Sequence, residues 1–268
     1  MAESTYCQFR VARLRPTWRR LTGPERSELL AGLEALVSRY PEVRVDPYLP
    51  GDGDPGCDFM LRLESSDPRA LEEMGAWMAA AAFFQHVEPV LTARGRTLTP
   101  RYVTPEQVEA LLRREPAPDL GRHAFLFRIS RTRDWWHLPD QERRAMVREH
   151  VDRGLAAGEP IYRCCYYCAG LDDQQDFLYY LESYSEAAVL EAYAAAQALR
   201  DARYWARHDL VFQGRLVTLA KWKDRVRLGI AHRPGAQPAA AEPGEAGPLP
   251  QHLGAPPGEM PPPPGAHP

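Results

Sequence analysis

The sequence lacks any apolar run of the length that a membrane-spanning helix needs, which is about 18 residues. The segment Met1–Arg15 lacks the basic stretch and following apolar stretch of a secretory signal peptide. The five cysteines are an odd number, and three of them crowd into the short run "CCYYC", so they do not form the pattern of a disulfide framework. These absences predict a cytoplasmic protein with no membrane partner.

Nucleotide-binding and hydrolase motifs are also missing. The sequence contains no Gly-rich dinucleotide fingerprint, no phosphate-binding loop, no serine nucleophile elbow and no zinc-protease helix motif. Lys and Arg number 33 against 36 Asp and Glu, so the chain has no excess of positive charge for binding nucleic acid. The run Cys164–Cys168 does not predict a zinc site, because neighbouring strand residues face opposite sides and no second ligand pair is present.

The body of the chain repeats itself. Residues 8–26 resemble residues 126–143, and residues 58–65 resemble residues 176–183. Three pairs of identical residues lie 118 positions apart: Phe9 and Phe127, Trp18 and Trp136, Asp58 and Asp176. Such self-similarity predicts two halves of the same architecture.

Each half has the pattern strand, helix, strand, strand, helix, strand. In the first half we expect strands at 6–14, 44–48, 58–64 and 87–98, with helices at 23–39 and 68–85. In the second half we expect strands at 124–132, 161–168, 176–182 and 210–219, with helices at 139–156 and 185–204. This is the ferredoxin-like order. The predicted fold class is therefore α+β, with two tandem ferredoxin-like halves that form a barrel-like sheet pair with outer helices.

The domain boundaries follow from this pattern. The N-terminal ferredoxin-like half covers residues 1–98, residues 99–122 form a linker with one short helix, and the C-terminal half covers residues 123–230. Residues 231–268 are rich in Pro, Gly and Ala, which predicts a disordered tail because such a segment cannot bury enough apolar surface to offset its ordering entropy.

Two residues stand out as candidates for chemistry. His150 lies on the apolar stripe of the helix predicted at 139–156, together with Met146 and Val151. Arg163 lies within a mostly apolar and aromatic strand, where an unpaired buried charge would cost several kcal/mol. His150 could be a core histidine bonded to a backbone carbonyl, and Arg163 could face an open side of the sheet or pair with a nearby Asp. The alternative is that Arg163 faces a cavity in which an anion binds.

A longer set of residues gives a more specific indication. It consists of Trp135, Trp136, Leu138, Pro139, Glu142, Arg143, Met146 and His150, followed by Arg163, by "GLDD" at 170–173 and by "DF" and "ES" in residues 176–183. This set closely resembles the chlorite dismutase family of haem proteins, and the resemblance covers about residues 125–215. It implies an enzyme, a haem oxidoreductase with haem b as cofactor, that converts chlorite to chloride and dioxygen.

The resemblance also implies roles for single residues. His150 would be the proximal ligand of the haem iron, and Asp201 would accept the other N–H of its ring, at a position where the dismutases carry Glu. Arg163 would be the catalytic distal residue that holds a small anion, either chlorite or a peroxide-like oxidant.

Three further residues would contact the haem. Arg131 is a candidate for a haem propionate, and Trp136 is a candidate for packing near the haem edge. Phe127 stands where the coproheme decarboxylases of the same family have a tyrosine. Trp135 is expected in the core.

Two alternatives stay open. One is a coproheme decarboxylase of haem biosynthesis, and the other is a haem-binding or haem-sensing protein without dismutase activity. The family resemblance also implies a homo-oligomer, with a pentamer as the expected form and a dimer as the second possibility.

Overall fold

The computed structural model describes residues 4–51, 56–97, 122–155 and 161–229, and these residues belong to one compact unit, Met1–Pro234. The linker predicted at 99–122, apart from Arg122, and the disordered tail predicted at 231–268 lie outside the described residues. Among the helices described, none is long and apolar enough to cross a membrane.

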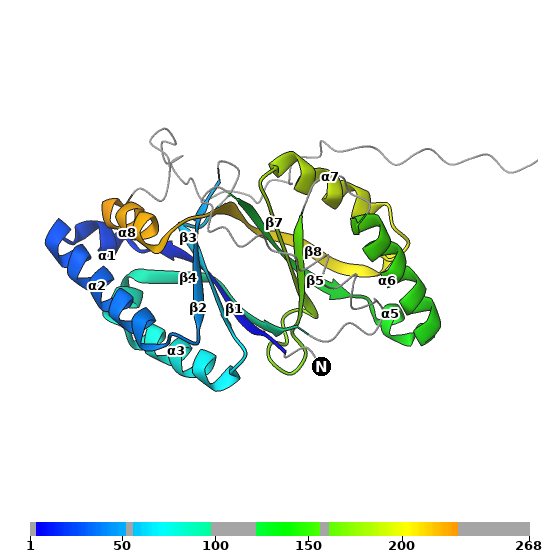
Figure 1. Cartoon of the computed structure of the whole chain (residues 1–268), viewed down its shortest axis with the longest axis horizontal. Coiled ribbons are helices and arrows are strands. Elements are labelled where there is room, and N and C mark those ends of the chain that lie inside the picture. Colours follow the sequence, from blue (N-terminus) through cyan, green and yellow to red (C-terminus); the bar gives the residue numbers. More distant parts are fainter. Residues whose placement is uncertain (1–3, 52–55, 98–121, 156–160, 230–268) are drawn as a thin grey trace, which may run out of the picture. The chain divides into compact units, whose positions relative to one another are not determined.

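Eight antiparallel strands close into a barrel in the order β1-β3-β2-β8-β5-β7-β6-β4 (Figure 1). Each half contributes its four strands in the same relative order, with its last strand beside its first, then its third, then its second. The halves meet where β2 pairs with β8 and where β4 pairs with β6. The strands are β1 (Tyr6–Leu14), β2 (Arg44–Pro50), β3 (Phe59–Ser65), β4 (Val87–Arg96), β5 (His123–Arg131), β6 (Tyr162–Tyr167), β7 (Phe177–Ser183) and β8 (Trp205–Leu216).

Helices cover the outer faces of the strands. In Figure 1, α1, α2, α3 and α8 lie against the first half, whereas α5, α6 and α7 lie against the second half. The helices are α1 (Pro16–Arg20), α2 (Gly23–Arg39), α3 (Pro68–Ala80), α5 (Arg133–His137), α6 (Asp140–Leu155), α7 (Glu186–Gln197) and α8 (Leu219–Leu228), with short 3-10 turns η1 (Ala82–His86) and η2 (Ala202–Tyr204). The predicted duplicated α+β fold with a barrel-like sheet pair is confirmed.

The ends of the helices follow from local sequence. Thr22 and Glu25 form a reciprocal capping box at the start of α2, and Pro24 adds a residue suited to the first turn. The end of the chain body was predicted wrongly, because residues 210–219 were expected to form the last strand and no helix was expected after it. Instead β8 ends at Leu216, and α8 runs from its N-cap Thr218 to Gly229, whose positive φ of 66° ends the helix.

Side chains alternate between the two faces of each strand, so the barrel interior and the cores under the helices are separate. The barrel interior contains a cluster that includes Phe9, Tyr48, Cys164, Tyr166 and Tyr180. A second core lies between the first half of the barrel and its helices, and a smaller third core lies between the second half and α7. Because successive strand residues face opposite sides, Arg163 and Cys165 point away from the interior. None of the cysteines forms a disulfide.

The first strands of the two halves align with an offset of 117 residues, one fewer than the 118 that separate Asp58 from Asp176. The Leu14 and Arg131 N–H groups donate to Asp58 and Asp176 respectively, so Leu14 corresponds to Arg131, 117 positions later. The predicted equivalence of Phe9 with Phe127 is therefore wrong. Phe9 faces the interior, whereas Phe127 faces outward, because a shift of one residue moves a side chain to the other face of the sheet.

The same correction applies to the tryptophans. Trp18 and Trp135 occupy the same place in α1 and α5, three residues after the N-caps Arg15 and Thr132. Both are buried, as expected for Trp135, whereas Trp136 is 47% exposed. The equivalence of Trp18 with Trp136 was thus also one residue out of register.

Candidate functional site

The duplication provides an internal comparison for the second half. By strand pairing and helix starts, the positions of Arg131, His150, Arg163 and Asp201 correspond to Leu14, Leu33, Val45 and Phe83 in the first half. These four first-half residues belong to, or pack against, the apolar core under α2, α3 and α8. The second half therefore replaces four apolar side chains by two guanidinium groups, an imidazole and a carboxylate. This concentration of charge is the main feature of the candidate site.

Asp201 lies at the centre of this group. It is 1% exposed, and its Oδ2 accepts a hydrogen bond of 2.8 Å from Nη2 of Arg131. Nη1 of Arg131 donates to the Asp201 backbone carbonyl at 2.9 Å, and the guanidinium lies 4.3 Å from the centre of the Trp135 ring. Arg131, predicted as a partner for a haem propionate, is thus held against Asp201.

His150 faces the other carboxylate oxygen. Its Nδ1 lies 3.7 Å from Oδ1 of Asp201, which is longer than a hydrogen bond, and Oδ1 is a buried atom without a hydrogen-bond partner. The structure therefore brings His150 and Asp201 together as predicted, but at a separation that leaves the bond between them unformed. Burial alone would raise the pKa of Asp201, but His150 and Arg131 outweigh it, so the pKa of this carboxyl is lowered.

Arg163 lies beside the helix that carries His150. A Cβ built on Gly154 would lie 3.5 Å from Nε of Arg163, an ordinary van der Waals distance, so the guanidinium packs directly beside Gly154. Nη1 donates to the Ile161 carbonyl at 3.2 Å, while Nη2 is buried without a hydrogen-bond partner. Arg163 makes no ion pair with any carboxylate in the part of the chain that the structure describes. An opposed placement of His150 and Arg163 across a macrocycle stays a prediction.

A row of residues across the sheet forms the wall beside this group. Cys165 pairs with Tyr179, and Tyr179 pairs with Phe127, all on the outward face. Burial raises the pKa of Tyr179 to about 12, whereas Cys165, its neighbour on the same face, is exposed to solvent. Solvent therefore reaches the outward face of the sheet at Cys165. The Tyr179 ring lies 6.1 Å from the ring of His150, edge to face.

Aromatic rings surround the remaining predicted positions. Phe127 is nearly parallel to the rings of Tyr193 and His208, at 5.0 and 5.3 Å. Trp136 is nearly parallel to Phe177 at 6.2 Å, with about half of its surface exposed. Both predicted positions are thus packed against aromatic neighbours.

Two neighbours of the site were missed at the level of sequence. Tyr179 could have been found, because alternation along residues 176–182 places it on the same side as Phe177. His208 gives no local signal. Burial, followed by the positive charges of Arg131 and His150, lowers its pKa to about 4, so its imidazole is neutral near neutral pH.

The donor set fits a haem better than a bare metal ion. Within the described residues, no group of three or more His, Cys, Asp or Glu could hold a metal ion. A single histidine is enough for a haem, whose macrocycle supplies the other ligands. Since Nδ1 of His150 faces a carboxylate, Nε2 is the nitrogen that would hold a haem iron, the usual arrangement of a ligating histidine. Oδ1 of Asp201, which has no hydrogen-bond partner, would then accept the Nδ1–H.

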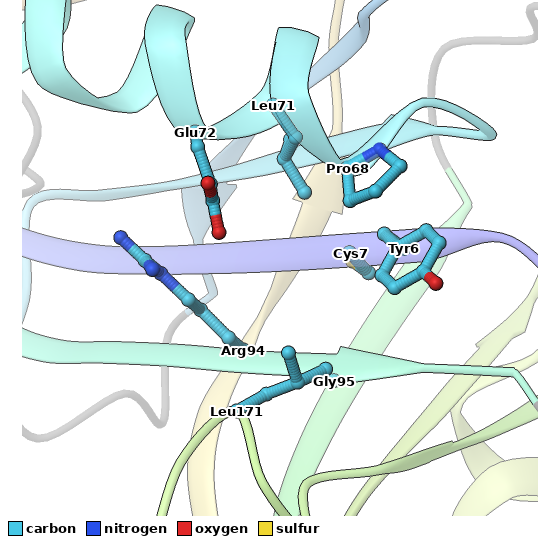
Figure 2. A pocket seen from close by; sticks show the side chains of 8 residues that line it. All are labelled: Tyr6, Cys7, Pro68, Leu71, Glu72, Arg94, Gly95 and Leu171. Carbon is cyan, nitrogen blue, oxygen red and sulfur yellow. The ribbon is translucent and has the colours of Figure 1, made fainter.

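A hollow elsewhere on the barrel contains none of these residues. Figure 2 shows it between α3, β1 and β4, and its lining residues are Tyr6, Cys7, Pro68, Leu71, Glu72, Arg94, Gly95 and Leu171. Leu171 belongs to the turn between β6 and β7, where Asp172 accepts a hydrogen bond from the Arg94 N–H. The hollow marks the seam where β4 meets β6, and we assign it no chemistry.

Comparison with known proteins places this chain in a family. Residues 26–212 match the family described as chlorite dismutase. The chlorite dismutase of Ideonella dechloratans is 26% identical over 187 residues, which cover 68% of this chain and 65% of that protein. The chain thus spans somewhat less than two thirds of that relative.

Solved structures show the same fold. A variant of the chlorite dismutase from Candidatus Nitrospira defluvii superimposes with a TM-score of 0.75 at 20% identity, covering 83% of this chain and 95% of that one. The enzyme from the same organism in complex with imidazole gives a TM-score of 0.74 at 20% identity, with the same coverage. At these identities the structural likeness extends to the fold.

Proposed function

Since this chain belongs to the chlorite dismutase family, we propose that it is a haem b oxidoreductase that converts chlorite to chloride and dioxygen. The observation that carries the proposal is the second-half group of His150, Asp201 and Arg131, which replaces three apolar core residues of the first half. A buried carboxylate–arginine pair beside a partly buried histidine has little value for stability compared with apolar packing, so a functional reason for it is favoured.

In this proposal His150 would hold the haem iron through its Nε2. Asp201 accepts the Nδ1–H of His150, which fixes the tautomer and makes the ring a stronger donor. Asp is one methylene shorter than Glu, so the Asp201 carboxylate lies 3.7 Å from Nδ1 and not within hydrogen-bond distance. This separation has to shorten for the bond to form. Arg131 holds Oδ2 and the backbone carbonyl of Asp201, so it positions the carboxylate.

Arg163 is the proposed anion-binding residue. Its buried Nη2 has no acceptor, and a guanidinium that lacks a carboxylate partner can bind a small anion through charge-assisted hydrogen bonds. A fixed positive charge at this place would stabilise negative charge on the substrate as it reacts. When bound, the haem iron supplies the redox chemistry, and the chain supplies binding, orientation and electrostatics.

The test begins with binding. The purified full-length chain is titrated with haemin, and the Soret absorption is followed for the wild type, for His150→Ala and for His137→Ala. His137 is an exposed histidine on α5 and is the matched control. We expect a haem complex in the wild type and in the control, and a loss of the axial-ligand spectrum in His150→Ala. A wild-type chain that leaves haemin free would overturn the proposal.

The activity arm separates the dismutase from its relatives. Chlorite-dependent release of dioxygen is measured with the wild type and with Arg163→Ala, and we expect it to depend on Arg163. Arg128→Ala is the matched control, since Arg128 is a partly exposed arginine that pairs with Asp209. Haem binding without dioxygen release in the wild type would leave a haem-binding protein and exclude the dismutase.

The second candidate, coproheme decarboxylation, is tested in parallel. Phe127 has no phenolic group, which opposes this activity, but Tyr193 brings a phenol into ring contact with Phe127. Added coproheme and peroxide should yield little haem b if the proposal holds. The expected homo-pentamer remains a prediction, for which light scattering of the purified protein gives the mass.

A further inference from the structure

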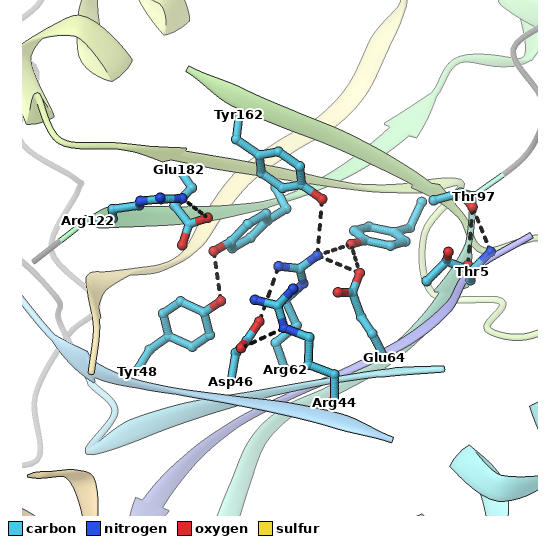
Figure 3. A network of polar contacts seen from close by, with 12 residues as sticks. Thr5, Arg44, Asp46, Tyr48, Arg62, Glu64, Thr97, Arg122, Tyr162 and Glu182 are labelled. Atoms are coloured by element: carbon cyan, nitrogen blue, oxygen red, sulfur yellow. Dashed lines mark hydrogen bonds and ion pairs between the residues drawn. The ribbon is translucent and has the colours of Figure 1, made fainter. Parts of the chain in front are cut away.

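The barrel interior contains a polar network that the proposed haem site does not use (Figure 3). At its centre is Arg62, whose side chain is fully buried. Nη2 of Arg62 lies 2.5 Å from Oε1 of Glu64 and 2.6 Å from the hydroxyl of Tyr166. The guanidinium also lies 4.5 Å from the centre of the Tyr180 ring. Burying these charges is costly, so the network raises the question of what it does.

The hydroxyl of Tyr166 donates a hydrogen bond of 2.5 Å to Oε1 of Glu64. Tyr166 is completely buried, and burial raises the pKa of its hydroxyl well above the usual value, so the phenol stays protonated. A protonated phenol loses an electron readily only when a base accepts its proton at the same time. Glu64, whose carboxylate pairs with Arg62 and accepts the Tyr166 hydrogen bond, is such a base in direct contact.

The neighbouring tyrosines have a different environment. Tyr48 and Tyr180 share a hydrogen bond of 2.8 Å between their hydroxyls, and a phenol is a much weaker proton acceptor than a carboxylate. The hydroxyl of Tyr162 accepts a hydrogen bond of 3.3 Å from Nη2 of Arg62, and a guanidinium group is a donor that cannot take up the phenolic proton. Tyr166 is therefore a tyrosine of this network whose hydroxyl proton already points to a carboxylate oxygen.

Aromatic rings surround Tyr166 on the inner face of the barrel. Phe9 lies 5.6 Å from Tyr166 and 5.8 Å from Tyr180, and Tyr180 lies 6.0 Å from Tyr162. On the outer face, Tyr179, the strand neighbour of Tyr180, lies 6.1 Å from the ring of His150. Strand β6 itself carries Arg163 outward and Tyr166 inward. The thickness of one strand therefore separates the Tyr166 network from the face that carries the candidate site.

Close packing holds Tyr166 in place. A Cβ added to Gly95 would lie 2.7 Å from Cβ of Tyr166, so β4 passes directly over this residue. The phenol is thereby separated from solvent and from external reductants. A radical formed there would be protected from rapid quenching.

We propose that Tyr166 and Glu64 form a redox-active pair that stores one oxidising equivalent inside the barrel. Tyr166 gives one electron to an oxidant and its hydroxyl proton to Oε1 of Glu64, so the phenolic O–H bond breaks, a carboxylic O–H bond forms, and a neutral tyrosyl radical results. In the reverse step the radical takes one electron from a small one-electron donor of the ascorbate class, and the proton returns from Oε1 of Glu64 to the phenolic oxygen. The identity of the natural oxidant rests on the proposed function: it would be a peroxide-class or chlorite-class oxidant that acts at the haem.

The experiment does not require haem. The full-length chain is oxidised by one electron with photogenerated ruthenium(III) tris-bipyridine, with persulfate as the terminal acceptor, and frozen for electron paramagnetic resonance. We expect a tyrosyl radical in the wild type that is lost in Tyr166→Phe and retained in Tyr184→Phe, since Tyr184 is an exposed tyrosine. Thermal unfolding of each variant confirms that Phe keeps the ring packing.

Two further measurements decide the role of Glu64. Glu64→Gln removes the proton acceptor but keeps the shape, so the radical yield should fall, and the deuterium isotope effect on radical formation should change. In the wild type, ring-deuterated tyrosine should narrow the signal, and added ascorbate should quench it slowly because the site is buried. An unchanged radical in Tyr166→Phe or in Glu64→Gln, or fast ascorbate quenching in the wild type, would overturn the proposal. Failure of the chain to bind haemin would overturn the haem function and leave this test intact.

Discussion

Replacing Arg131 by Leu tests how strongly the candidate site depends on its buried ion pair. Leu stands at the corresponding position in the first half, where Leu14 is buried in an apolar core. The Arg131 side chain is 12% exposed and that of Asp201 is 2% exposed, so solvent cannot replace the lost partner. Two hydrogen bonds to Asp201 would disappear at once.

The expected cost follows from that burial. Removing one partner of a buried ion pair costs about 3–5 kcal/mol, because the remaining charge stays buried without compensation. Protonation of Asp201 limits the cost, so Arg131→Leu should be less destabilising near pH 5 than near pH 7. The assay is urea unfolding of the purified chain at both pH values, followed by circular dichroism.

Two controls make the result interpretable. Arg128→Leu removes an arginine from the same strand, but its partner Asp209 is 48% exposed, so about 0–1 kcal/mol is expected. The double variant Arg131→Leu with Asp201→Leu removes both charges and should cost less than Arg131→Leu alone. The reasoning would be refuted if Arg131→Leu cost no more than Arg128→Leu, or if the double variant cost the sum of the two single ones.

Three further changes probe other parts of the molecule. Burial raises the pKa of Asp46 to about 7, so the folded state holds a proton that the unfolded state releases between about pH 4 and pH 7. The free energy of unfolding should therefore fall by up to about 4 kcal/mol as pH rises through this window. Asp46→Asn should remove this slope in urea titrations, and an unchanged slope would contradict the reasoning. The depressed pKa of His208, about 4, acts oppositely, because the unfolded state binds the proton between about pH 4 and pH 6.5; His208→Phe should therefore abolish a gain in stability with rising pH, seen in the same titration. Gly95→Ala should destabilise the folded chain by about 1–3 kcal/mol, because the added Cβ would meet Tyr166. Gly32→Ala in α2 should instead stabilise it by about 0.5–1 kcal/mol, since nothing lies within 4 Å of a Cβ there. Equal melting temperatures for the two variants would contradict this reading.

Much of the fold could be predicted from local patterns. Alternation along residues 161–168 placed Arg163 and Cys164 on opposite faces, and the Thr22–Glu25 capping box marks the start of α2. Helix α8 was missed although Thr218 and Gly229 carry its end signals, because the repeat of the first half gave no expectation of a further helix. The register of the duplication was off by one at β5, since sequence identity aligned two Phe residues that face opposite sides of the sheet.

The sequence by itself determined most of the elements, the existence of the duplication and the residue types of the site, because these depend on neighbours a few positions apart. Only the tertiary structure decided which distant groups meet. Arg131 is 70 positions from Asp201, and Tyr166 is 102 positions from Glu64, so their contacts exist only once the strands are paired around the closed barrel. The physical reason is that a strand's period fixes which face a side chain occupies, whereas the residue opposite that face depends on how the whole chain closes.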